Sequence, residues 1–156
     1  MDNCYLELPL GEYFKEENIL KLIYLLENKP ECRNIFTDEL IIRMAIFKNN
    51  KKALTYALNK GFATNGLIYD VLLYSIKNND VMLAEYALSH KVDLSQEEYY
   101  ALKFAVISNC KEIARCIIDI IEKNSGNAIE IIANQLLMNF DVERNKKVLT
   151  KLVEEY

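Results

Sequence analysis

The sequence contains little glycine and proline, with 4 Gly and 2 Pro among 156 residues. A β-sandwich needs a turn residue about every 8–12 positions, so this scarcity argues against that class. Histidine occurs once, and none of the four cysteines forms a Cys-x-x-Cys pair. A structural zinc site needs about four Cys or His ligands in clustered spacing, so we expect no metal. We also expect no nucleotide cofactor, because no glycine-rich phosphate-binding motif is present.

Long apolar runs and a strong charge of one sign are also missing. The longest apolar candidate, 113–121, is broken by Arg115 and Asp119, so we expect no membrane span. No basic region followed by an apolar stretch opens the sequence, so we expect no signal peptide. A net charge of −4 argues against a nucleic-acid binder. The scattered cysteines are typical of reduced thiols. They predict a protein located in the cytoplasm, either of the cell that encodes it or of a host cell.

Hydrophobic residues make up 51% of the chain and charged residues 27%. This composition predicts one folded domain with a sizeable core. The abundance of Leu, Ile, Ala, Lys and Glu favours a mainly helical protein.

An internal repeat is present, because the segments 49–58, 79–88 and 109–118 align at a constant offset of 30 residues. The matching columns are Asn49, Asn79 and Asn109; Tyr56, Tyr86 and Cys116; Ala57, Ala87 and Ile117; Leu58, Leu88 and Ile118; and, upstream, Ala45, Ser75 and Ala105. Such self-similarity is typical of stacked repeat proteins.

Each repeat is predicted to form two short helices. The expected pairs are 38–47 with 51–60, 67–76 with 81–90, and 97–107 with 111–122. We expect Asp38 to be the first N-cap, an Asn-containing turn to join the helices, and Gly61 to end the second helix. Looser patterns predict a helix over 17–28 and a last pair over 128–138 and 145–155.

The stretch from Lys60 to Asn65, Lys-Gly-Phe-Ala-Thr-Asn, resembles the end of an ankyrin repeat, and His90 to Ser95 is similar with Lys91 in the place of the glycine. Ala53-Leu54, Leu83-Ala84 and Ile113-Ala114 take the place of the family's Ile-Val pair. The family's Thr-Pro-Leu-His signature is absent, and the spacing is shorter than the usual ~33 residues. We therefore expect the projecting hairpin fingers to be trimmed to tight loops.

The resemblance implies an all-α, ankyrin-like solenoid of about five antiparallel helix pairs in a single domain over 1–156. The clearest repeats are 38–66, 67–96 and 97–126, with atypical caps at 1–37 and 127–156. Repeat stacks usually end in such atypical caps.

Ankyrin proteins usually bind another protein on a concave face formed by the first helices and the loops before them. The resemblance carries that role to Glu39, Phe47, Lys48, Tyr69, Lys77, Asn78, Tyr99, Ile107 and Ser108. We expect Phe47, Tyr69, Lys77, Tyr99 and Ile107 to form one continuous patch. Inter-repeat packing is the alternative role for the tyrosines.

No pattern in the sequence points to catalysis. His90 could serve as a base for Ser89 or Cys116, but a position at a helix C-terminus explains it more simply. We expect a non-enzymatic module that binds a partner protein as an inhibitor, an adaptor or a decoy. In its composition the chain resembles the degenerate ankyrin proteins of large DNA viruses, intracellular bacteria or mobile elements, which include phages. The alternatives are a self-assembling structural protein, such as a homodimer, or an enzyme with an unrecognised site.

Overall fold

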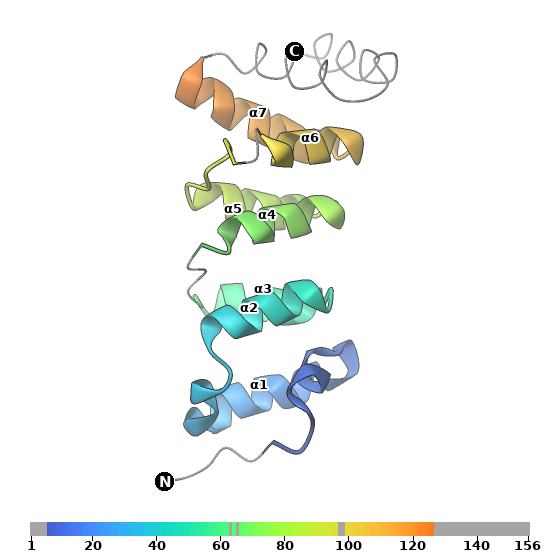
Figure 1. Ribbon diagram of the computed structural model, residues 1–156, viewed down its shortest axis with the longest axis vertical. Helices are drawn as coiled ribbons and strands as arrows, with labels where there is room; N and C mark the ends of the chain where they lie inside the picture. The colour runs from blue at the N-terminus through green and yellow to red at the C-terminus, as the bar shows by residue number, and fades with distance from the viewer. Residues whose placement is uncertain (1–5, 63, 65, 97–98, 127–156) are drawn as a thin grey trace. The chain divides into compact units, whose positions relative to one another are not determined.

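The computed structural model describes residues 6–62, 64, 66–96 and 99–126, and these residues form helices and connecting turns without a strand. The chain divides into two compact units, 1–70 and 71–156. The boundary lies in the first turn of the helix over Ile68–Lys77. The prediction of an all-helical protein is confirmed for this part of the chain (Figure 1).

The first unit combines short 3-10 helices with three α-helices. Its elements are η1 (Leu10–Phe14), η2 (Glu16–Asn18), α1 (Ile19–Asn28), η3 (Pro30–Asn34), α2 (Asp38–Phe47) and α3 (Lys51–Asn59). The helices predicted over 38–47 and 51–60 are present, and α3 ends one residue early. The helix expected over 17–28 begins at Ile19, because the preceding residues form η2.

An aromatic cluster occupies the core of the first unit. The rings of Tyr13 and Phe36 meet edge to face at 5.6 Å between centroids, and Phe14 lies 6.1 Å from Phe36. Asn50, which is buried, donates its side-chain amide to the Phe14 carbonyl oxygen at 2.9 Å. This bond ties η1 to the turn between α2 and α3.

The second unit contains two helix pairs. Its elements are α4 (Ile68–Lys77), whose first three residues belong to the first unit, α5 (Val81–Ser89), α6 (Tyr100–Ile107) and α7 (Lys111–Ser125). Within this unit α6 and α5 both pack against α7. The Cys110 thiol donates to the Ile76 carbonyl oxygen at 3.3 Å, so the turn before α7 is bound to the end of α4.

Both units use the same turn between paired helices. Asn49, Asn79 and Asn109 have φ values of 52°, 49° and 58°, the left-handed conformation that asparagine tolerates better than most residues. The next residue in each copy donates its backbone N–H to a carbonyl five residues back, at 2.8, 2.8 and 2.9 Å. These bonds close a Schellman motif and reverse the chain, and the carbonyls belong to Ala45, Ser75 and Ala105. Those three small residues are fully buried, so the Asn and small-residue columns of the repeat have a common structural cause.

The second helices of two pairs also end in the left-handed conformation. Gly61 has φ +71° and Lys91 has φ +53°. The prediction that Gly61 ends the helix is confirmed, and Lys91 has the same left-handed backbone conformation as Gly61.

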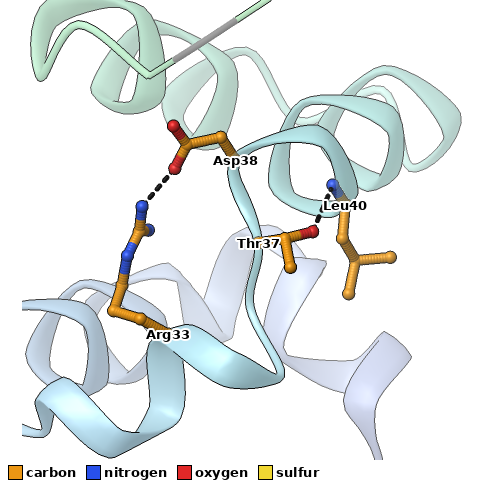
Figure 2. A network of polar contacts seen from close by, with 4 residues as sticks. All are labelled: Arg33, Thr37, Asp38 and Leu40. Atoms are coloured by element: carbon orange, nitrogen blue, oxygen red, sulfur yellow. Dashed lines mark hydrogen bonds and ion pairs between the residues drawn. The ribbon is translucent and has the colours of Figure 1, made fainter.

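The N-cap of α2 differs from the prediction. Thr37, not Asp38, is the cap, and its hydroxyl oxygen accepts the Leu40 backbone N–H at 3.3 Å (Figure 2). Asp38 instead pairs with Arg33 of η3. The ion pair with Arg33 engages Oδ1 of Asp38, and the neighbouring Thr37 hydroxyl takes the capping position.

The repeat column of Leu58, Leu88 and Ile118 is buried in all three copies. Leu58 and Leu88 retain 6% and 8% exposure, and Lys52 is exposed. The expected last helix pair, 128–138 and 145–155, lies outside the described residues. Along the described part of the chain, no helix is both long and apolar enough to cross a bilayer.

Candidate binding surface

The end of α2 exposes a large aromatic side chain. Phe47 is 76% exposed, and the Lys48 ammonium lies 5.3 Å from the centre of its ring. Glu39, on the first turn of the same helix, is exposed and accepts a hydrogen bond from Arg43 at 2.9 Å. These predicted site residues are therefore accessible to a partner.

The ends of α4 and α6 are also exposed. Ile107 is 66% exposed and is followed by exposed Ser108. Lys77 and Asn78 are exposed, and the Asn78 amide donates to the Tyr74 carbonyl oxygen of α4 at 2.9 Å. Phe47–Lys48, Lys77–Asn78 and Ile107–Ser108 are called the first-helix ends below. The continuity of these surfaces across the two units stays a prediction.

The two tyrosines of the predicted patch differ from the expectation of exposed anchors. Tyr69 is 7% exposed, so its ring is not available to a partner, and the packing alternative describes it better. Tyr99 is half-buried and has φ +62°, an uncommon conformation for an aromatic residue. It precedes α6 without a capping side-chain bond.

A second exposed apolar surface was not predicted from the sequence. Leu20 and Tyr24 lie one turn apart on α1 and are 77% and 58% exposed. The sequence could have indicated this surface, because α1 contains more apolar residues than are needed to form one buried face. Its first residue and the positions Leu22 and Leu25 already form the buried stripe.

A polar and aromatic cluster closes the open end of the α2–α3 hairpin. Lys60 binds Glu27 at 2.9 Å, which lowers the pKa of Glu27 and raises that of Lys60, mainly through the side-chain hydrogen bond. The Tyr56 hydroxyl donates to the same carboxylate at 3.3 Å, and burial followed by the nearby Glu27 charge raises its pKa. Arg33 lies over the Phe62 ring at 4.3 Å. These contacts pair each of the charged groups, which indicates a structural role.

His90 is not arranged to accept the Ser89 proton through Nδ1. Its Nδ1 lies 2.7 Å from the Tyr86 carbonyl oxygen and 3.1 Å from the Ser89 hydroxyl oxygen. A carbonyl oxygen only accepts hydrogen bonds, so Nδ1 must carry the hydrogen and cannot take the serine proton. The Ser89 hydroxyl itself donates to the Tyr86 carbonyl at 2.7 Å.

The cysteines are not all reduced thiols, as the sequence led us to expect. Cys32 is disulfide-bonded and fully buried, whereas Cys110 and Cys116 are free. Burial raises the pKa of both free thiols above the ordinary value, which keeps them protonated. Cys4 lies outside the described residues. The cytoplasmic assignment therefore loses the support of its thiol argument and stays a prediction.

Across the ranges that the structure describes, no three His, Cys, Asp or Glu side chains group closely enough to hold a metal ion. Comparison of the chain with protein-family models, curated proteins and solved structures finds no match. The resemblance to ankyrin repeats therefore depends on the residues of this chain alone.

Proposed function

We propose that this chain is a non-enzymatic protein-binding module with the repeat arrangement of an ankyrin-like solenoid. The first-helix ends are its binding surface. The module blocks or scaffolds its partner in the cytoplasm, either of its own cell or of a host cell.

One observation carries this proposal. Phe47 and Ile107 stand at the same position of the repeat, two periods apart, and both are more than 60% exposed at the end of a first helix. Polar residues follow each of them, Lys48 and Ser108. A large apolar side chain with a polar rim is the usual composition of a protein interface.

The ankyrin-like arrangement is supported by the local geometry of the repeats. The Schellman turn recurs at 30-residue intervals, and the small residues before it are buried in all three copies. Identical hairpins at a constant interval are the units from which a solenoid is stacked. The proposed number of pairs, about five, includes the cap regions.

The experiment that tests this function combines capture with paired variants. The full chain is immobilised, proteins retained from a cell lysate are identified by mass spectrometry, and the affinity of the purified partner is measured. Phe47→Ser with Ile107→Ser should weaken binding about 30-fold if the two side chains together contribute ~2 kcal/mol.

Met82→Ser is the matched control, because Met82 is 81% exposed on a second helix. It should leave the affinity unchanged. Equal losses in the control and the double variant, with both proteins folded, would contradict the proposed surface. Dimers of the isolated chain in light scattering, with no captured partner, would favour the self-assembling alternative.

A further inference from the structure

The exposed face of α1 adjoins a cleft within the first unit. The cleft has a volume of about 250 Å³ and is lined by Glu7, Tyr13, Leu20, Lys21, Tyr24, Leu25 and Lys29. We call it the α1 cleft. The Tyr13 hydroxyl accepts the backbone N–H groups of Glu7 and Leu8 at 3.0 and 3.3 Å, which holds the chain at the edge of the cleft.

The lysines of the α1 cleft differ from most other cations of this unit. Each of five other cations forms an ion pair with an acidic side chain: Lys15, Arg33, Arg43, Lys52 and Lys60. No ion pair joins Lys21 or Lys29 to another described residue. Lys21 lies in the first turn of α1, and Lys29 directly follows its last residue. The cleft therefore combines two lysines that form no ion pair with a described residue and the apolar surface of Leu20 and Tyr24.

We propose that the α1 cleft binds a segment of a partner protein that carries a large apolar side chain flanked by carboxylates. The apolar side chain packs on Leu20 and Tyr24, and the carboxylates pair with Lys21 and Lys29. This inference rests on the proposed protein-binding function and adds a second surface with a defined ligand chemistry.

Charge decides between this occupant and a second copy of the chain. A two-fold interface places the same surface patch on both subunits. Two copies that met through the α1 cleft would bring lysines to both sides, and among the described residues that line the cleft Glu7 is the one acid on each side. An acidic segment instead neutralises both lysines, and charge complementarity of this kind gives specificity.

The test selects ligands without assuming their sequence. A phage-displayed library of random 16-residue peptides is selected on the full-length protein, and enriched peptides are synthesised and measured by fluorescence anisotropy. We expect enriched peptides with a large apolar residue between acidic residues. Replacing those acids by amides should weaken binding at least tenfold.

Two variants of the protein locate the bound peptide. Leu20→Ser with Tyr24→Ser, and separately Lys21→Glu with Lys29→Glu, should each weaken binding at least tenfold. Met82→Ser with Lys111→Glu is the matched control, because it changes an exposed apolar residue and an exposed lysine that lie outside both proposed surfaces. That control should bind the peptide as the parent does. Melting curves followed by circular dichroism establish that each variant is folded, and the charge reversal alone suffices if the serine variant is not.

Several results would overturn the inference. Selection that enriches no peptide, or only peptides without acidic residues, contradicts the proposed ligand. Binding that is kept in both cleft variants and lost in Phe47→Ser with Ile107→Ser leaves the protein-binding function in place and removes the cleft. A dimer in light scattering that the Leu20 and Tyr24 changes dissociate assigns the cleft to a second copy.

Discussion

Gly61→Ala should destabilise the protein by about 1 kcal/mol through backbone conformation alone. Gly61 ends the α3 hairpin with φ +71°, and a Cβ added there meets no atom within 4 Å. The left-handed conformation costs an L-residue about 1–2 kcal/mol. Alanine also lowers the conformational entropy of the unfolded chain, which stabilises the folded state by about 0.4–1 kcal/mol. The difference leaves a net loss of about 1 kcal/mol.

Lys91→Gly is the reciprocal change at the equivalent position of the next repeat. Lys91 is exposed and has φ +53°, so glycine relieves the strain of a side chain in this conformation. Its larger unfolded-state entropy offsets part of that gain, and a net stabilisation of about 0.5 kcal/mol is expected. The two substitutions should therefore shift stability in opposite directions.

Gly11→Ala is the control for these changes. Gly11 lacks a positive φ, and an added Cβ would contact the Met44 methyl carbon at an ordinary 3.9 Å. Urea unfolding and thermal melting, both followed by circular dichroism at 222 nm, measure all three variants. Gly61→Ala should lower the melting temperature by about 2–4 °C, whereas Gly11→Ala should leave it unchanged or raise it. Equal shifts for the two alanines, or a less stable Lys91→Gly, would refute the assignment of these turns.

Asn50→Ala should cost about 2 kcal/mol in urea unfolding, because Asn50 both caps α3 and donates to the buried Phe14 carbonyl. Thr37→Ala removes only an exposed cap and should cost about 1 kcal/mol, so equal losses would contradict the double role of Asn50. Leu88→Ala should cost about 2–5 kcal/mol, against less than about 0.5 kcal/mol for Lys52→Ala on the exposed face. The pKa of Glu27 is lowered in the folded protein from its ordinary 4.5, so its ion pair stabilises the fold above that value. The stability advantage of the parent over Glu27→Gln should disappear as pH falls below 4.5 through the folded-state pKa, and an advantage that persists in acid would contradict this assignment.

The helix pairs were predictable because local chemistry determines them. Asn79 shows this well, since an asparagine between two apolar stripes predicts a left-handed turn, and the structure has φ 49° there. Gly61 carries the same kind of information at the end of a second helix. The repeat multiplies such signals, because the same residue type recurs at the same place in each copy.

Other features depend on tertiary contacts that no single segment reveals. The choice between Thr37 and Asp38 as N-cap follows from the position of Arg33, which comes from a different helix. The 3-10 helices before α1 are too short to show a periodic pattern of apolar residues from which they could be predicted. Tyr69 was placed on the surface by its repeat position, but its ring is buried. Leu20 and Tyr24 of α1 are exposed because no described element packs over their face of the helix.

Site-specific photo-crosslinking tests the proposed binding surface most directly. Benzoylphenylalanine is introduced in place of Phe47, Ile107 or Met82, three exposed apolar residues, and each protein is irradiated in cell lysate. We expect crosslinks from positions 47 and 107 to the same partner protein and none from position 82. Crosslinks from position 82 alone, or equal crosslinking from all three positions, would contradict binding through the first-helix ends.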